Sequence, residues 1–156
     1  MKRIIIISVL SLFPMLMSAQ SDMDSFFSRF NGEEGYQSIV YGKRMLEMMK
    51  NDASPDVKDL LDKIRVIRIV NSSKPENSFI DLARRELQRH KKHEIISLVN
   101  EADCTLEFHI TDEDRKTKEV SFVMIICRPQ VSAVMEIIGR FDVKDINRLS
   151  VIGQKQ

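Results

Sequence analysis

The sequence lacks the motifs on which most enzyme assignments rest. It contains no nucleophile elbow, no phosphate-binding glycine loop, no paired-carboxylate spacing and no recognised set of metal ligands. His90 and His93 lie three residues apart, but no cysteine or carboxylate accompanies them in a known ligand pattern. The acidic stretch Asp112–Asp114 lacks the spacing of a calcium loop. We therefore expect no catalytic residues, no metal and no cofactor, although these absences leave enzymatic activity itself undecided.

An excess of charge of one sign is also lacking. The 156 residues include 24 basic and 23 acidic residues. Lys2 and Arg3 are two of the basic ones, so residues 20–156 carry 22 basic residues against 23 acidic ones. A nearly neutral domain has no global electrostatic attraction to nucleic acid, so we expect no nucleic-acid partner. The chain also lacks an internal repeat and a Gly/Pro-rich linker, and its length fits a single domain.

Cysteine is scarce, and the two residues present, Cys104 and Cys127, flank a predicted hairpin. A turn centred between Arg115 and Lys116 would place them opposite each other and allow a disulfide. The alternation of apolar side chains along both strands favours a register one residue away, which would put Cys127 on the other face. The sequence leaves two alternatives, a disulfide or two separate small buried hydrophobic residues.

The first residues have the pattern of an export signal. A positively charged start precedes an apolar run over residues 4–17, and small residues follow it up to Ala19. Such a run is typical of a signal peptide and is short for a membrane anchor. We expect residues 1–19 to be a signal peptide and residues 20–156 to be a periplasmic or extracellular domain. No cysteine follows the run to carry a lipid, so the expected membrane contact is limited to an uncleaved leader or a weak peripheral contact.

Hydrophobic periodicity predicts both helices and strands. Helical spacing of apolar residues occurs in segments 21–30, 43–50, 55–63 and 75–92, and Ser54-Pro55 is a strong helix start. Strand-like alternation or β-prone runs occur in segments 36–41, 65–70, 94–101, 104–111, 119–127 and 131–139. A final helical turn is expected at 145–149. The sequence therefore predicts a single α+β domain: a mostly antiparallel sheet of about five to six strands, with helices packed mainly on one face.

The last two predicted strands carry apolar side chains on both faces. Val123, Ile125, Val134 and Ile138 share the second face. Leaving such side chains in water forfeits about 1.5–3 kcal/mol each, so we expect a cover over them. The cover is the protein's own N-terminal aromatic helix, a partner protein or a second copy. These four residues are therefore a candidate interaction face, with an envelope protein or self-association as the expected partner.

A cluster of basic residues ends the predicted helix over 75–92. Cations near the C-terminal end of a helix stabilise it by about 0.3–1 kcal/mol each, and this is one interpretation of the cluster. The other interpretation is a local site for an anion or an acidic partner. Its candidate residues are Arg84, Arg85, Arg89, Lys91 and Lys92.

Several stretches of the chain are similar to one bacterial exported family. The strongest are Lys116–Ile125 and Ile138–Val143, and weaker ones are Phe30, Gly35–Leu46, Ile64–Val70 and His93–Ile96. In these stretches the chain resembles the family called domain of unknown function 4252. The resemblance covers nearly all of residues 20–156, but its motifs are hydrophobic patterns plus Gly139. It implies a small extracytoplasmic α+β domain, and it transfers no active-site residue.

Two classes of function remain in view from the sequence. The first is a non-enzymatic protein-interaction module of the cell envelope, which binds through the apolar sheet face or the aromatic helix. The alternative is a small-molecule-binding protein or an unrecognised hydrolase of the periplasm. That alternative needs a cleft with convergent polar groups, for which His109, Glu107 and Arg140 are the candidates.

Overall fold

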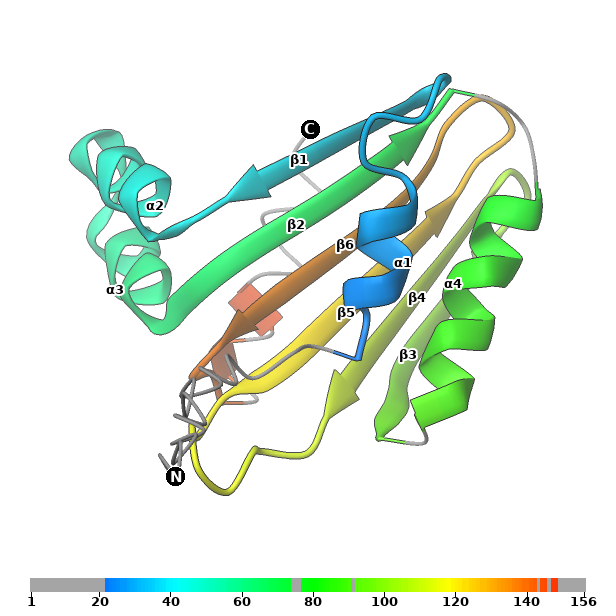
Figure 1. Ribbon diagram of the computed structural model, residues 1–156. Helices are drawn as coiled ribbons and strands as arrows, with labels where there is room; N and C mark the ends of the chain where they lie inside the picture. The colour runs from blue at the N-terminus through cyan, green and yellow to red at the C-terminus, as the bar shows by residue number, and fades with distance from the viewer. Residues whose placement is uncertain (1–21, 74–76, 91, 143, 146, 149–156) are drawn as a thin grey trace, which may run out of the picture.

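The computed structural model describes residues 22–73, 77–90, 92–142, 144–145 and 147–148. Within these residues lie four α-helices, a 3-10 turn at Lys50–Asp52, and six strands (Figure 1). The helices are α1 (Asp24–Arg29), α2 (Lys43–Met49), α3 (Pro55–Lys63) and α4 (Asn77–His90). The strands are β1 (Tyr36–Tyr41), β2 (Ile64–Ser72), β3 (His93–Glu101), β4 (Cys104–Thr111), β5 (Val120–Cys127) and β6 (Ser132–Gly139). The expected signal peptide, residues 1–19, and part of the expected turn at 145–149 lie outside the described residues.

All six strands belong to one antiparallel sheet in the order β1-β2-β6-β5-β4-β3. β1 and β3 are therefore its two edges. α4 connects β2 to the far edge strand β3, and β6 then returns to lie between β2 and β5 (Figure 1). The predicted class, an α+β domain with an antiparallel sheet of five to six strands, is confirmed.

Local sequence signals account for where the helices start and stop. Ser54 is extended (φ −64°, ψ 158°) and precedes Pro55 at the first helical position, as expected, although the Ser54 side chain makes no capping hydrogen bond. Gly42 occupies the N-cap position of α2, as Ser54 does for α3. α1 is followed by Gly32 at φ +80°, a conformation that favours glycine. Met23 precedes α1 and makes no side-chain capping hydrogen bond.

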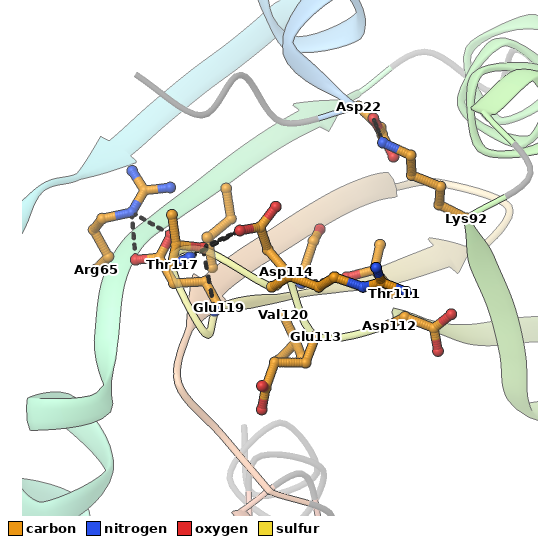
Figure 2. A pocket seen from close by; sticks show the side chains of 13 residues that line it. Asp22, Arg65, Lys92, Thr111, Asp112, Glu113, Asp114, Thr117, Glu119 and Val120 are labelled. Atoms are coloured by element: carbon orange, nitrogen blue, oxygen red, sulfur yellow. Dashed lines mark hydrogen bonds and ion pairs between the residues drawn. The ribbon is translucent and has the colours of Figure 1, made fainter. Parts of the chain in front are cut away.

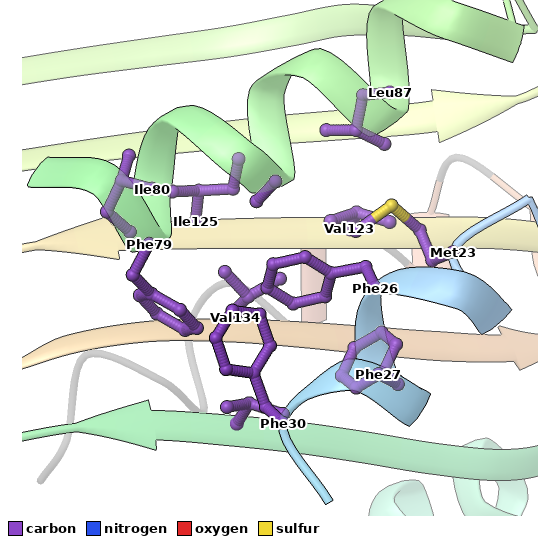
Figure 3. Close-up of a cluster of buried hydrophobic side chains, with 12 residues drawn as sticks. Met23, Phe26, Phe27, Phe30, Phe79, Ile80, Leu87, Val123, Ile125 and Val134 are labelled. Atoms are coloured by element: carbon purple, nitrogen blue, oxygen red, sulfur yellow. The ribbon is translucent and has the colours of Figure 1, made fainter. Parts of the chain in front are cut away.

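One face of the sheet, called here the helix face, is covered by α1 and α4. The two helices enclose an apolar cluster against β2, β5 and β6 (Figure 3). Phe79 of α4 is fully buried, and its ring lies 5.1 Å from that of Phe30 and 5.5 Å from that of Tyr36, centroid to centroid. These aromatic contacts hold α1, α4 and β1 together.

The opposite face is covered at one end by α2 and α3. Leu46 of α2 and Leu60 of α3 pack against Phe122 and Ile137 of the sheet. The expected placement of helices mainly on one face therefore describes α1 and α4, whereas α2 and α3 lie on the other side. Both faces of β5 and β6 are apolar, so both need a cover.

The prediction that these apolar residues of β5 and β6 form an interaction face is wrong. Val123, Ile125 and Val134 are fully buried under α1 and α4, and Ile138 is 7% exposed. The protein's own helices supply the cover, because the aromatic side of α1 and the apolar side of α4 meet over this face. These four residues belong to the core and offer no surface to a partner.

The disulfide is also absent. Both Cys104 and Cys127 are free thiols. Thr105 lies opposite Cys127 in the β4–β5 ladder, so Cys127 faces the helix side while Cys104 faces the opposite side. The observed register places Phe108 opposite Met124, so the apolar alternation assigned the faces of the two strands correctly.

A buried ion pair lies within the helix face. Glu136 of β6 is fully buried and accepts hydrogen bonds from Arg68 Nε at 2.9 Å and from Ser121 Oγ at 2.6 Å. Arg68 also bonds Asp24 of α1 and lies 4.5 Å over the Phe27 ring. Arg68 and Glu136 belong to the sheet and Asp24 belongs to α1, so these contacts join α1 to the sheet.

None of the described helices is both long enough and apolar enough to cross a lipid bilayer.

Candidate functional site

β3 is an exposed edge strand of unusual composition. Eight of its nine residues are exposed, and four of these are large and apolar: Ile95 (57%), Ile96 (45%), Leu98 (54%) and Val99 (36%). Edge strands present free backbone hydrogen-bonding groups, and proteins usually protect them with charges or proline. β3 has neither between residues 95 and 100. The other edge, β1, is shorter, and Val40 is its one large apolar side chain that is exposed.

A groove runs between β3 and α4 on the helix face. It encloses roughly 330 Å³. We call it the α4–β3 groove. Its lining residues are Arg84, Leu87, Gln88, His93, Ile95, Leu98, Glu107 and His109. Ile95 lies opposite His109 and Leu98 opposite Glu107 in the β3–β4 ladder, which places all four on this face. Apolar walls over a few convergent polar groups are the usual makeup of a binding site.

A hydrogen-bonded triad forms the polar part of the groove. Arg84 of α4 donates through Nε to Glu107 Oε1 at 2.7 Å, and His109 Nε2 lies 3.2 Å from Glu107 Oε2. Burial by itself would raise the pKa of Glu107, but the hydrogen bonds from Arg84 and His109 outweigh it and hold the pKa below its ordinary value. The bond to Glu107 correspondingly raises the pKa of Arg84. Glu107 therefore stays ionised and is fully engaged.

His93 stands apart from this triad. Its side chain is fully buried, and neither ring nitrogen has a hydrogen-bond partner among the described residues. Burial lowers its pKa, and the carboxylate of Asp22, 4.0 Å from Nδ1, offsets this only in part. His93 is thus held neutral at physiological pH, which suits a packing role better than a charged one.

A second cleft, of roughly 370 Å³, lies at the turn between β4 and β5 (Figure 2). Several of its polar groups already have partners within the protein. Arg65 donates to both oxygens of Glu119 at 2.8 and 3.0 Å, and Lys92 lies 3.8 Å from Asp22. Asp114 accepts the backbone N–H groups of Lys116 and Thr117, at 2.8 Å each, and closes the turn. Unlike the groove, which has the exposed Ile95 and Leu98, this cleft has only the buried Val120 and Ile138 as large apolar lining residues.

A third cleft, of roughly 290 Å³, surrounds the two cysteines. Arg128 Nε lies 3.5 Å from Cys104 Sγ, and this contact raises the pKa of Arg128. No group of three or more His, Cys, Asp or Glu side chains in the described part of the chain is placed to hold a metal ion.

The candidate anion patch is partly engaged by the protein itself. Arg84 bonds Glu107 and so belongs to the groove. Arg89 and Lys92 have side chains that are 74% and 70% exposed. Arg85 is exposed and donates to the Asp81 carbonyl at 3.3 Å. Lys91 lies outside the described residues, and anion binding at the other positions stays a prediction.

Two members of the expected trio of polar groups meet, and the third does not. Glu107 and His109 meet, as proposed, because residues two apart on a strand share a face. Arg140 does not join them: it is exposed and donates to the Thr117 carbonyl at 3.2 Å. Arg84 takes its place, and sequence reasoning missed it because the pairing spans 23 residues.

Comparisons with known proteins give one family. A crystal structure of a protein of unknown function, PA94 from Pseudomonas aeruginosa, is similar at 10% identity over 79% of each chain, with a TM-score of 0.39. No curated protein matches. Residues 30–149 match the family described as domain of unknown function DUF4252, the family that the sequence motifs resemble. The chain belongs to the DUF4252 family.

Proposed function

We propose that this protein is an exported, non-enzymatic interaction module of the cell envelope, which binds an extended segment of a partner protein along β3. The proposal rests on one observation, the exposure of a nine-residue edge strand with four large apolar side chains. An added strand would satisfy the free backbone groups of that edge, and its side chains would cover the apolar ones.

The α4–β3 groove supports the same site. Ile95 and Leu98 point into it from the edge strand, and Leu87 faces them from α4. Alternate side chains of an added strand would fall on the helix face beside this groove. Backbone pairing would then supply affinity and the groove would supply side-chain selectivity.

A matched pair of surface variants tests the site. Leu98 and Val40 are similarly exposed, at 54% and 61%, but lie on opposite edges of the sheet. Immobilised residues 20–156 should capture a partner from envelope extract, Leu98→Lys should lose it, and Val40→Lys should retain it. Equal behaviour of the two variants would refute the assignment to β3. A dimer of the purified domain that only Leu98→Lys dissociates would assign the edge to a second copy instead.

Export is supported by the apolar run over residues 4–17 and the small residues that follow it. Expression of the full chain in a bacterial host should yield a product that begins near Gln20 and is released with the periplasmic fraction. Mass spectrometry of the recovered protein measures this directly. An intact N-terminus in the cytoplasmic fraction would contradict export.

The groove also favours a second candidate, the binding of a small neutral molecule. Arg84 and Glu107 compensate each other in charge, and the walls are apolar. A ligand found by thermal stabilisation should lose its effect in Ile95→Lys, because Ile95 lines the groove. It should keep its effect in Ile96→Lys, because Ile96 does not. Loss in both variants would count against a groove site.

A further inference from the structure

The two faces of the β3 edge differ in charge. Glu94 lies opposite Ile110 and Glu101 opposite Cys104, so both acids lie on the face away from α4, and both are exposed. Between them on that face lie Ser97 and Val99. A strand laid along this edge therefore meets a negative charge near each end on one face and an uncharged stretch between.

The helix-facing side of the same edge is uncharged. Ile95 and Leu98 point toward the groove, and Asn100 follows Leu98 on this side. The nearest charged groups, Arg84 and Glu107, bond each other. A charged side chain entering here would lose hydration without gaining a free partner, whereas an apolar one would gain contact with Leu87 and the two edge residues.

From this arrangement, and resting on the proposed function, we infer that the segment bound along β3 is a seven-residue strand with a basic side chain at each end and large apolar side chains at its fourth and sixth positions. Pairing is antiparallel, as in the rest of the sheet. The first residue then faces Glu101, the fourth Leu98, the sixth Ile95 and the seventh Glu94.

The bulge in β3 sets the length of this segment. Ladder pairing with β4 skips Ile96, so the eight residues from Glu94 to Glu101 span seven ladder positions. Six steps of an extended chain cover about 20 Å. The two acids therefore select basic residues six apart in the partner, which share a face because their separation is even.

Synthetic peptides with blocked ends test the inference. The probe is Lys-Thr-Val-Leu-Thr-Leu-Lys, and its matched controls carry Glu at both ends, Ser in place of both Leu, or Pro in place of Val. At low ionic strength the wild-type domain should bind the Lys-ended peptide about fivefold more tightly than the Glu-ended one, since exposed ion pairs contribute about 0.2–1 kcal/mol each. The Ser peptide should bind more weakly still, and the Pro peptide should bind more weakly than the probe, because Pro removes one backbone N–H and fixes φ.

A charge-reversed domain separates this inference from the proposed function. Glu94→Lys combined with Glu101→Lys should reverse the preference, so that the Glu-ended peptide binds more tightly, and circular dichroism should confirm an unchanged fold. Binding of both peptides with equal affinity by the wild type, or an unchanged preference in the variant, would overturn the inference and leave strand addition standing. Failure of every peptide to bind would overturn the proposed function together with the inference.

Discussion

Gly139 lies where the backbone of the α3–β2 junction leaves no room for an added carbon atom. A Cβ built there would lie 2.2 Å from the Lys63 carbonyl oxygen and 2.9 Å from Ile64 Cα, both backbone atoms at the junction of α3 and β2. Real Cβ atoms essentially never approach within 3.0 Å, so the backbone must move. The same carbonyl accepts the Arg140 N–H at 2.9 Å, and that hydrogen bond would be strained or lost.

The expected cost of Gly139→Ala is about 3 kcal/mol of unfolding free energy. Overpacking typically costs about 1–3 kcal/mol, and loss of the hydrogen bond adds about 0.5–1.5 kcal/mol. Reduced entropy of the unfolded chain offsets about 0.4–1 kcal/mol of this. Urea denaturation measures the change directly, and the thermal midpoint should fall by roughly 10 °C.

Gly42→Ala is the matched control for this prediction. No atom lies within 4 Å of a Cβ at Gly42, and its φ of −83° suits any residue. Its stability should stay within about 1 kcal/mol of the wild type, because the change in chain entropy opposes the slightly poorer helix cap. If Gly139→Ala were no more destabilising than this control, the argument from close approach would be wrong.

Three further predictions concern the buried groups. Glu136→Ala should cost about 3 kcal/mol in urea denaturation because it leaves Arg68 buried with Asp24 as its remaining carboxylate, and a combined Arg68→Met, Glu136→Leu variant should recover most of the loss. Burial lowers the pKa of His93 in the folded state, so the unfolded chain binds more protons and the free energy of unfolding should fall as the pH drops below about 6.5. His93→Leu should flatten this dependence between pH 7 and pH 5. An unchanged slope in the variant would contradict the prediction. Phe79→Ala should cost about 3–5 kcal/mol, whereas a Val40→Ala control should stay within about 0.5 kcal/mol by thermal unfolding.

The fate of the two-sided strands shows where sequence reasoning succeeded and where it did not. The apolar residues at 123, 125 and 134 required a cover, and the cover exists. From the sequence, the cover was the N-terminal aromatic helix, a partner protein or a second copy. The packing shows that α1 and α4 of the same chain supply it. The exposed strand went unnoticed because Ile95, Ile96, Leu98 and Val99 look like a buried central strand when read alone.

The polar residues of the helix face illustrate the same limit. Glu107 and His109 alternate with apolar neighbours, a pattern typical of a solvent-facing side of a strand, yet they are 6% and 5% exposed. Arg84 makes this burial tolerable for Glu107, and Arg68 does the same for Glu136. Pairings across 23 and 68 residues leave no periodic signal in the chain.

The sequence by itself determined the elements: the strand bounds of β1 and β4, the start of α3, the α+β class and the family. These follow from side-chain periodicity and turn residues, which act over a few neighbouring positions. The tertiary structure alone decided which strand became the exposed edge, which helices covered which face and which thiols stayed apart. Such outcomes depend on contacts between residues far apart in the chain, and a shift of one residue in register changes the face of every side chain on a strand.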